Sequence, residues 1–179
     1  MSGLSVYHCG YEKCPPAHSY GPAVRDHYLI HYVVSGKGEF ITEYGIFPLS
    51  AGDLFLIRPG QTTTYRAIPE DPYEYYWVGF NGAEAAQMII SSGYSNDHPI
   101  ISYTKDEAAL SYLKLLFLSA ENPVTAEFDM LGYLYLFLSC LIRSSADPAK
   151  KSVSYNNILN RAVKYIHGNY SREVNISDI

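Results

Sequence analysis

The chain has 179 residues, of which 47% are hydrophobic and 17% charged, and this composition excludes an intrinsically disordered protein. Its formal net charge of -5 excludes a chain that grips a nucleic-acid backbone by itself, because such binding needs clustered lysine and arginine. The sequence has no signal-peptide pattern and no apolar run of the roughly 20 residues that span a membrane. Its cysteine count is odd. These features predict a cytoplasmic protein with reduced thiols and no membrane partner.

Short runs rich in β-branched and aromatic residues fill the first half of the chain, and Gly, Pro and Asp separate them. This pattern is typical of antiparallel strands. Residues 2–8 predict an edge strand, and residues 11–22 predict a proline-rich arm or loop. The main strands are expected at residues 28–34, 39–42, 46–49, 54–57, 62–67 and 73–80.

Glycines mark the reversals between these strands. Gly36 and Gly38 are expected to bracket a tight hairpin, because left-handed backbone is readily accessible only without a Cβ. Gly52 and Gly60 mark two further reversals. We therefore predict a small antiparallel β-barrel over residues 1–103, of a size that holds one small ligand among its inward side chains.

The pattern becomes helical after residue 82. Residues 83–92 predict a short helix, and residues 100–102 predict a short strand. Thr104 and Glu107 have the spacing of a capping box, which predicts a second helix that runs to about residue 120.

The longest helical pattern covers residues 125–144. Its leucines recur at alternating three- and four-residue steps, and they are Leu131, Leu134, Leu138 and Leu141. This stripe is wider than one docking face needs, and its spacing suits a partner helix. We therefore expect residues 104–146 to form a homodimer through these leucines. The alternative is a helix buried wholly within one chain.

Residues 147–179 have the pattern of a polar linker followed by an amphipathic helix. Ser177 then has the character of a helix cap with no helix after it. We therefore interpret the chain as a fragment that ends at the start of a further domain.

Three segments, in this order and spacing, resemble the N-terminal effector-binding domain of AraC-type transcriptional regulators: HYVVSGKG at 31–38, AGDLFLIRPG at 51–60 and PYEYYWVGFNG at 72–82. The resemblance implies an α+β fold, with an N-terminal cupin-like antiparallel β-barrel (a double-stranded β-helix) and a C-terminal helical dimerisation segment. Residues 162–170 resemble the start of the family's DNA-binding domain, which carries two helix-turn-helix units. The resemblance thus implies that only the full-length protein binds DNA, whereas this chain senses and dimerises.

The resemblance also implies an effector pocket. In the sugar-responsive members it is lined by the positions that correspond to Ser35, Tyr65, Tyr75 and Trp77. Trp77 would stack on a pyranose ring, whereas an alternative is that it only fills the core. His31 shares the strand face of Ser35 and is a further candidate. Arg25 precedes this strand and either adds a charge to the pocket or forms a surface ion pair.

Two other function classes are alternatives to a sensor. Metal-dependent cupin enzymes hold their metal with a His-x-His and Glu cluster and a later histidine, but the six histidines here include no His-x-His pair. Cys9 and Cys14 have no nearby Cys/His pair to complete a zinc site. We therefore predict no catalytic residue, no metal and no cofactor. A barrel that is filled by its own side chains, and that serves only to dimerise, remains as the other alternative.

The preferred interpretation is the sensing and dimerisation domain of a bacterial regulator that responds to a sugar or a similar small polar molecule. The ligand is expected to order residues 6–22 over the pocket. This change would then shift the arrangement of the DNA-binding domains, provided that the ligand discriminates between the two arrangements.

Overall fold

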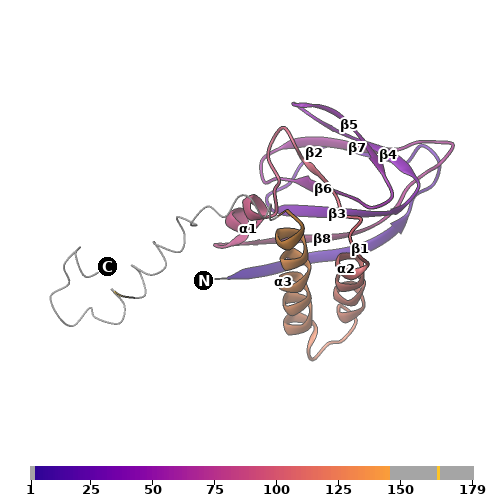
Figure 1. Cartoon of the computed structure of the whole chain (residues 1–179). Helices are drawn as coiled ribbons and strands as arrows, with labels where there is room; N and C mark the ends of the chain where they lie inside the picture. The colour runs from indigo at the N-terminus through magenta and orange to yellow at the C-terminus, as the bar shows by residue number, and fades with distance from the viewer. Residues whose placement is uncertain (1–2, 146–164, 166–179) are drawn as a thin grey trace. The chain divides into compact units, whose positions relative to one another are not determined.

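Runs of β-branched and aromatic residues form nine strands in the computed structural model, which describes residues 3–145 and residue 165. The strands are β1 (Leu4–Lys13), β2 (Ser19–Val24), β3 (Tyr28–Ser35), β4 (Lys37–Thr42), β5 (Gly45–Ser50), β6 (Asp53–Ile57), β7 (Thr62–Ala67), β8 (Glu74–Gly82) and β9 (Ile100–Ser102). Five make one antiparallel sheet in the order β1-β8-β3-β6-β9, and four make a second in the order β2-β7-β4-β5. The two sheets face each other (Figure 1), and the predicted α+β fold with a cupin-like barrel is confirmed.

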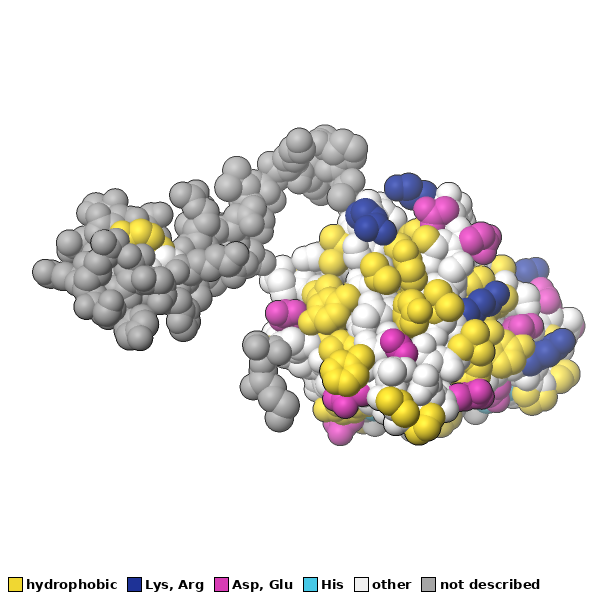
Figure 2. Space-filling view, turned by 90° about the horizontal axis from the view of Figure 1, so that it is seen from below, with side chains coloured by type: hydrophobic (Ala, Val, Ile, Leu, Met, Phe, Trp, Pro, Cys, Tyr) yellow, Lys and Arg dark blue, Asp and Glu magenta, His cyan; other side chains and the backbone are white. Residues whose placement is uncertain are grey.

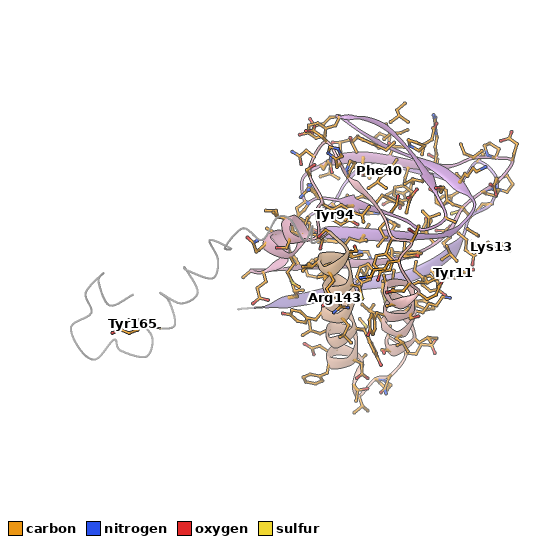
Figure 3. All side chains as sticks on the ribbon, viewed as in Figure 1. Tyr11, Lys13, Phe40, Tyr94, Arg143 and Tyr165 are labelled. Carbon is orange, nitrogen blue, oxygen red and sulfur yellow. The ribbon has the colours of Figure 1, made fainter. Side chains whose placement is uncertain are left out.

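The five-stranded sheet has a buried core on each face. In β3, Leu29 and Val33 join the core between the two sheets, whereas Ile30 and Tyr32 join the core between this sheet and the helices. The strand β6 is buried on both faces in the same way, which explains its continuous apolar run. Phe40 of β4 completes the inner core, where it packs on Phe55 and points between the sheets (Figure 3).

The strand connections differ from the prediction. Strands β3 and β4 lie in different sheets, so Gly36 and Gly38 carry the chain across a corner instead of bracketing a hairpin. Gly36 has a positive φ of 73°, whereas Gly38 is required by packing, because a Cβ there would overlap the ring of Tyr73. The hairpin lies between β4 and β5, where Gly45 is paired with Thr42.

The amino-terminal segment is built into both sheets, so the prediction of an arm or loop over residues 11–22 is wrong. Strand β1 continues to Lys13 as the partner of β8, and β2 pairs with β7. Pro22 fits because β2 is an edge strand, where a residue without an N–H is tolerated. Most of residues 6–22 is therefore paired with the two sheets in this structure, and the expectation that a ligand orders them stays a prediction.

Three helices confirm the predicted helical segments. They are α1 (Ala85–Ser91), α2 (Ala108–Ser119) and α3 (Ala126–Ser145). The predicted capping box does not form, and α2 begins later than expected. Asp106 occupies this end instead, where its Oδ1 accepts hydrogen bonds from the Ala108 N–H at 2.9 Å and the Tyr103 hydroxyl at 2.7 Å.

The predicted dimer leucines do not form an exposed stripe. Leu134, Leu138 and Leu141 are fully buried in the core that α2 and α3 share with the five-stranded sheet, and Leu131 is partly buried. The first three therefore cannot meet a partner helix. For them, the alternative of a helix buried within one chain is correct. Other apolar side chains of the helical segment are exposed, namely Leu115, Leu118, Val124, Phe128 and Leu136.

The barrel and the two long helices pack together in one compact unit, Met1–Ser145, and residues Ala146–Ile179 form a second unit. The predicted linker and helix of residues 147–179 lie outside the described residues, apart from Tyr165. Among the helices that the structure describes, none combines the length and apolar character needed to cross a membrane.

Gly38→Ala is expected to destabilise the fold by about 1–3 kcal/mol, the usual cost of overpacking a core, because its methyl group overlaps the buried ring of Tyr73. Urea denaturation followed by circular dichroism measures the free energy of unfolding. The matched control is Gly132→Ala in α3, where the added methyl group meets open space. This control is expected to stabilise the protein by about 1 kcal/mol. Equal stability of Gly38→Ala and the parent would contradict the close contact.

Candidate ligand-binding site

A cavity of about 350 Å³ lies inside the barrel, within the range of sites that hold small molecules. Both sheets and the segment between β2 and β3 contribute to its wall. The lining residues are His8, Glu12, His18, Tyr20, Arg25, Leu29, His31, Tyr65, Tyr75 and Trp77. Five of the six predicted ligand-binding residues therefore come together, and the exception is Ser35.

Strand β8 supplies two aromatic walls. Tyr75 and Trp77 lie on its inner face with their ring centroids 5.7 Å apart. Trp77 pairs with Gly10 of β1, and a Cβ on Gly10 would overlap the indole. Trp77 is only partly buried and lines the cavity, so it is not a sealed core residue.

His31 of β3 is a fully buried polar residue of the cavity wall. Its ring stacks on Phe55 at 4.4 Å, with an interplanar angle of 4°, and meets Tyr75 edge-on. Burial holds the pKa of His31 well below its ordinary value, and the charges of Arg25 and His8 add to this effect. Its Nδ1 is buried and has no hydrogen-bond partner among the described residues, which is uncommon for a buried polar atom.

Arg25 belongs to the cavity. The alternative of a surface ion pair is wrong, since the ion pairs of the described region do not include Arg25. Its guanidinium carbon lies 4.6 Å from the Tyr20 ring centroid, a cation–π contact, and its buried Nε has no partner in the described part of the chain. Burial raises the pKa of the neighbouring Tyr65 to about 12, and the charge of Arg25 opposes that shift.

Strand β1 provides residues that the sequence analysis missed. The register of β1 on β8 shifts between Val6 and His8, so one extra residue, Tyr7, interrupts the alternation. Val6 therefore packs toward the helices, whereas His8 and Glu12 line the cavity. The alternating positions of His8, Gly10 and Glu12 were the available signal for a polar inner face of this strand. A bulge, however, cannot be placed from the sequence alone.

A second register shift explains the position of Ser35. The pairing of β3 with β8 shifts between Val33 and Ser35, so Ser35 leaves the face that carries His31. Ser35 is exposed and donates a hydrogen bond to Glu74 Oε2 at 3.4 Å. It therefore lies outside the cavity that the other five predicted residues line.

A chain of hydrogen bonds holds the indole of Trp77 in place. Its Nε1 donates to His8 Nδ1 at 3.2 Å. His8 Nε2 must then carry a hydrogen, and it lies 2.8 Å from His27 Nε2, which leaves His27 Nδ1 to donate to Asp26 Oδ1 at 2.6 Å. This bond lowers the pKa of Asp26. Partial desolvation lowers the pKa of His8, and the charges of His27 and Arg25 add to this effect. The lowered pKa favours the neutral His8 ring that these hydrogen bonds require.

A second hydrogen-bonded group surrounds the Tyr75 hydroxyl. This hydroxyl donates to Glu12 Oε2 at 3.2 Å and lies 3.4 Å from His18 Nε2. His18 Nδ1 lies 3.6 Å from Glu12 Oε1. The cavity therefore combines aromatic faces with hydrogen-bonding groups of both polarities, a combination that suits a polar molecule with apolar faces.

Comparisons with known proteins agree with this architecture. A family model described as AraC-like ligand binding domain matches residues 5–138. The Msm operon regulatory protein of Streptococcus mutans is 32% identical over 98% of this chain and 64% of its own length. The raffinose operon transcriptional regulatory protein RafR of Pediococcus pentosaceus is 29% identical over 98% of this chain and 65% of its own length. The chain thus spans slightly less than two thirds of these relatives.

Among solved structures, an apo ToxT variant from Vibrio cholerae aligns with 99% of this chain and 69% of its own. The TM-score is 0.54 at 9% sequence identity, so the likeness concerns the fold alone.

His31→Phe is expected to reduce the acid sensitivity of stability. The folded-state pKa of His31 lies below that of the unfolded chain, about 6.5, so unfolding takes up a proton in acid and stability falls as the pH drops through this value. One such proton contributes about 1.4 kcal/mol per pH unit below pH ~6, and the variant should lose that slope. Urea denaturation at several pH values between about 5 and 7 measures how the free energy of unfolding changes with pH.

The matched control for this slope is His98→Gln, because His98 is exposed and lies outside the cavity. Equal slopes for His31→Phe and the parent would contradict a buried neutral His31.

Proposed function

The chain belongs to the family of AraC-like ligand-binding domains, and on this basis we propose that it senses a sugar that binds in the cavity between its two sheets. The observation that carries the proposal is the lining of this cavity. Aromatic rings stand beside two buried polar atoms, His31 Nδ1 and Arg25 Nε, that lack partners among the described residues. A sugar has apolar faces for the rings and hydroxyl groups for both atoms.

Each wall of the cavity has a role in this proposal. Trp77, whose indole is fixed by His8, stacks on a sugar ring. Arg25 donates to hydroxyl or ring oxygens, because a guanidinium has donors only. Glu12 accepts from hydroxyl groups on the side of β1. The name of the raffinose operon regulator, a relative at 29% identity, supports a sugar as the ligand class.

Strand β1 is the proposed link between the ligand and the helices. Its inner residues His8 and Glu12 line the cavity, while at its start the Leu4 N–H donates to the Tyr135 hydroxyl of α3 at 3.3 Å. A ligand that contacts the inner face of β1 therefore changes the packing of α3 on the outer face of the same strand. We propose that the full-length protein is a cytoplasmic transcriptional regulator, and that this change alters DNA binding by a region outside this chain.

The two alternative functions have less support. A barrel filled by its own side chains does not fit the cavity of about 350 Å³. A cupin enzyme with a central His-x-His metal site does not fit His31, because Leu29 and Val33 occupy the positions two residues away on either side. The proposal therefore assigns no catalytic residue to the barrel.

Arg25→Ala and Tyr65→Phe are expected to weaken sugar binding. Arg25→Ala removes charge-assisted hydrogen bonds, each worth about 1.5–3 kcal/mol, so its affinity should fall by about 10- to 100-fold. The single tryptophan of the chain, Trp77, makes fluorescence a direct readout for a panel of mono- and oligosaccharides, and calorimetry confirms the affinity. The matched control is Ser35→Ala, which lies outside the cavity and should bind as the parent does.

A panel that neither changes the Trp77 fluorescence nor raises the melting temperature of the parent would contradict the proposed sugar sensor. Loss of binding in Ser35→Ala equal to that in Arg25→Ala would contradict the assigned cavity.

We also propose that the chain forms a homodimer through the outward faces of α2 and α3. Figure 2 shows the molecule from below, where exposed hydrophobic side chains lie between acidic and basic ones. Phe128 is 75% exposed and Leu118 is 61% exposed, an unusual exposure for large apolar side chains near each other in sequence. These residues replace the buried leucines as the candidate interface.

The double variant Leu118→Glu and Phe128→Glu is expected to be a folded monomer, because charged groups at an apolar interface lose their solvation. Light scattering coupled to gel filtration measures the mass. The matched control is Ile46→Glu, which changes an equally exposed residue of β5, at 60%, and should remain a dimer. A double variant with the mass of the dimer would move the interface elsewhere.

A further inference from the structure

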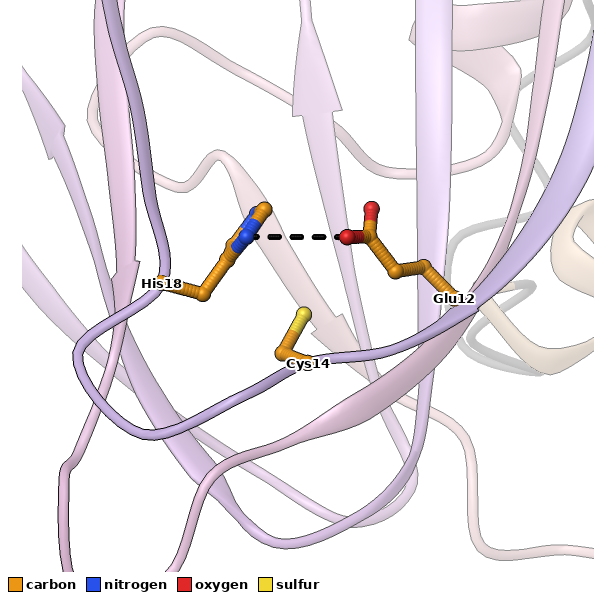
Figure 4. Close-up of side chains that lie close together, drawn as sticks. All are labelled: Glu12, Cys14 and His18. Carbon is orange, nitrogen blue, oxygen red and sulfur yellow. Dashed lines mark ion pairs between the residues drawn. The ribbon is translucent and has the colours of Figure 1, made fainter.

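Three potential metal ligands meet at the turn that joins β1 to β2. Glu12 is the second-last residue of β1, and Cys14 and His18 lie in the connection (Figure 4). Their ligand atoms all lie within 4.8 Å of one another. The sequence analysis considered Cys14 only with Cys9 and found no further pair, whereas the turn brings His18 back beside Glu12.

The spacing of the His18 and Glu12 ligand atoms suits a small tetrahedral ion. Bonds of about 2.0–2.3 Å to zinc place two tetrahedral ligands about 3.3–3.6 Å apart. His18 Nδ1 and Glu12 Oε1 are separated by 3.6 Å, so a zinc ion between them needs little movement of either side chain. Figure 4 shows the three side chains directed toward a common point.

The chemistry of the three ligands also favours zinc. Thiolate and imidazole are ligands of zinc and similar transition metals, whereas magnesium and calcium prefer oxygen ligands. One thiolate and one carboxylate balance the charge of a divalent ion. Cys14 is 4% exposed, so its sulfur is shielded from bulk solvent.

We propose that Glu12, Cys14 and His18 form a zinc-binding site beside the ligand cavity. Zinc replaces the thiol proton of Cys14, which is released to solvent, and three protein ligands leave a fourth position open. Glu12 and His18 also line the cavity, so the fourth position is open to water or to an oxygen of a bound molecule.

The site would join the end of β1 to the start of β2, which lie in different sheets. Bound zinc would therefore hold the two sheets together on this side of the cavity. The competing explanation is a hydrogen-bonded group around the Tyr75 hydroxyl, which contacts Glu12 and His18, with Cys14 serving as a buried apolar residue. Only the zinc site requires a thiolate bound to metal.

Cobalt and zinc titrations of the full chain distinguish the two explanations. Co²⁺ is expected to bind one ion per chain and to produce the near-ultraviolet charge-transfer band of a cobalt–thiolate bond. Zn²⁺, measured by competition with a chromophoric chelator, should displace cobalt, and excess Mg²⁺ should not. Cys14→Ser should abolish the band and weaken zinc binding by more than about 100-fold, since the loss of an outer-shell partner alone costs about 10- to 100-fold. Cys9→Ser is the matched control and should retain both.

His18→Gln and Glu12→Gln test the other two ligands. If circular dichroism shows that Cys14→Ser does not fold, these two variants replace it in the test. Both should weaken zinc binding while keeping the cobalt–thiolate band at saturating metal. Absence of that band in the parent, or equal metal affinity of Cys14→Ser and Cys9→Ser, would overturn the zinc site. Neither result depends on whether a sugar binds.

Discussion

The pairing of β8 with β1 on one side and β3 on the other is the interaction on which both halves of this structure depend. Because side chains alternate along a strand, β8 directs Tyr75 and Trp77 into the cavity and Val78 and Phe80 into the core under the helices. The same three strands thus form the wall of the site and the platform for α2 and α3. One backbone therefore carries the cavity wall on one face and the packing of the helices on the other.

Two register shifts decide which polar residues reach the cavity. The shift in β1 turns His8 and Glu12 inward after Val6 has faced the helices, and the shift in β3 turns Ser35 outward after His31 has faced inward. Each shift exchanges the two faces of a strand at the cost of one unpaired residue. The polarity of the site is therefore set by backbone irregularities as much as by the choice of residues.

Contacts among the lining side chains hold the cavity wall in place. The hydrogen-bond chain from Trp77 through His8 and His27 to Asp26 holds the indole, and stacking on Phe55 holds His31. Fixed groups lose little conformational entropy when they bind a ligand. In contrast, the buried Nε of Arg25 and Nδ1 of His31 lack partners among the described residues, and this unmet hydrogen-bonding capacity favours a polar occupant.

The sequence by itself determined most of the fold, because strand and helix patterns are local: the runs of β3 to β8, the short strand β9 and the three helices follow from periodicity and turn residues. It also predicted five residues of the cavity, from strand alternation and family resemblance. Only the tertiary structure decided that Leu134, Leu138 and Leu141 are buried within one chain, since a stripe of leucines is the same whether a sheet or a second chain covers it. The roles of His8, Glu12 and His18 depend on a bulge and a turn, whose positions are selected by pairing with β8 and β7 and not by the segment itself.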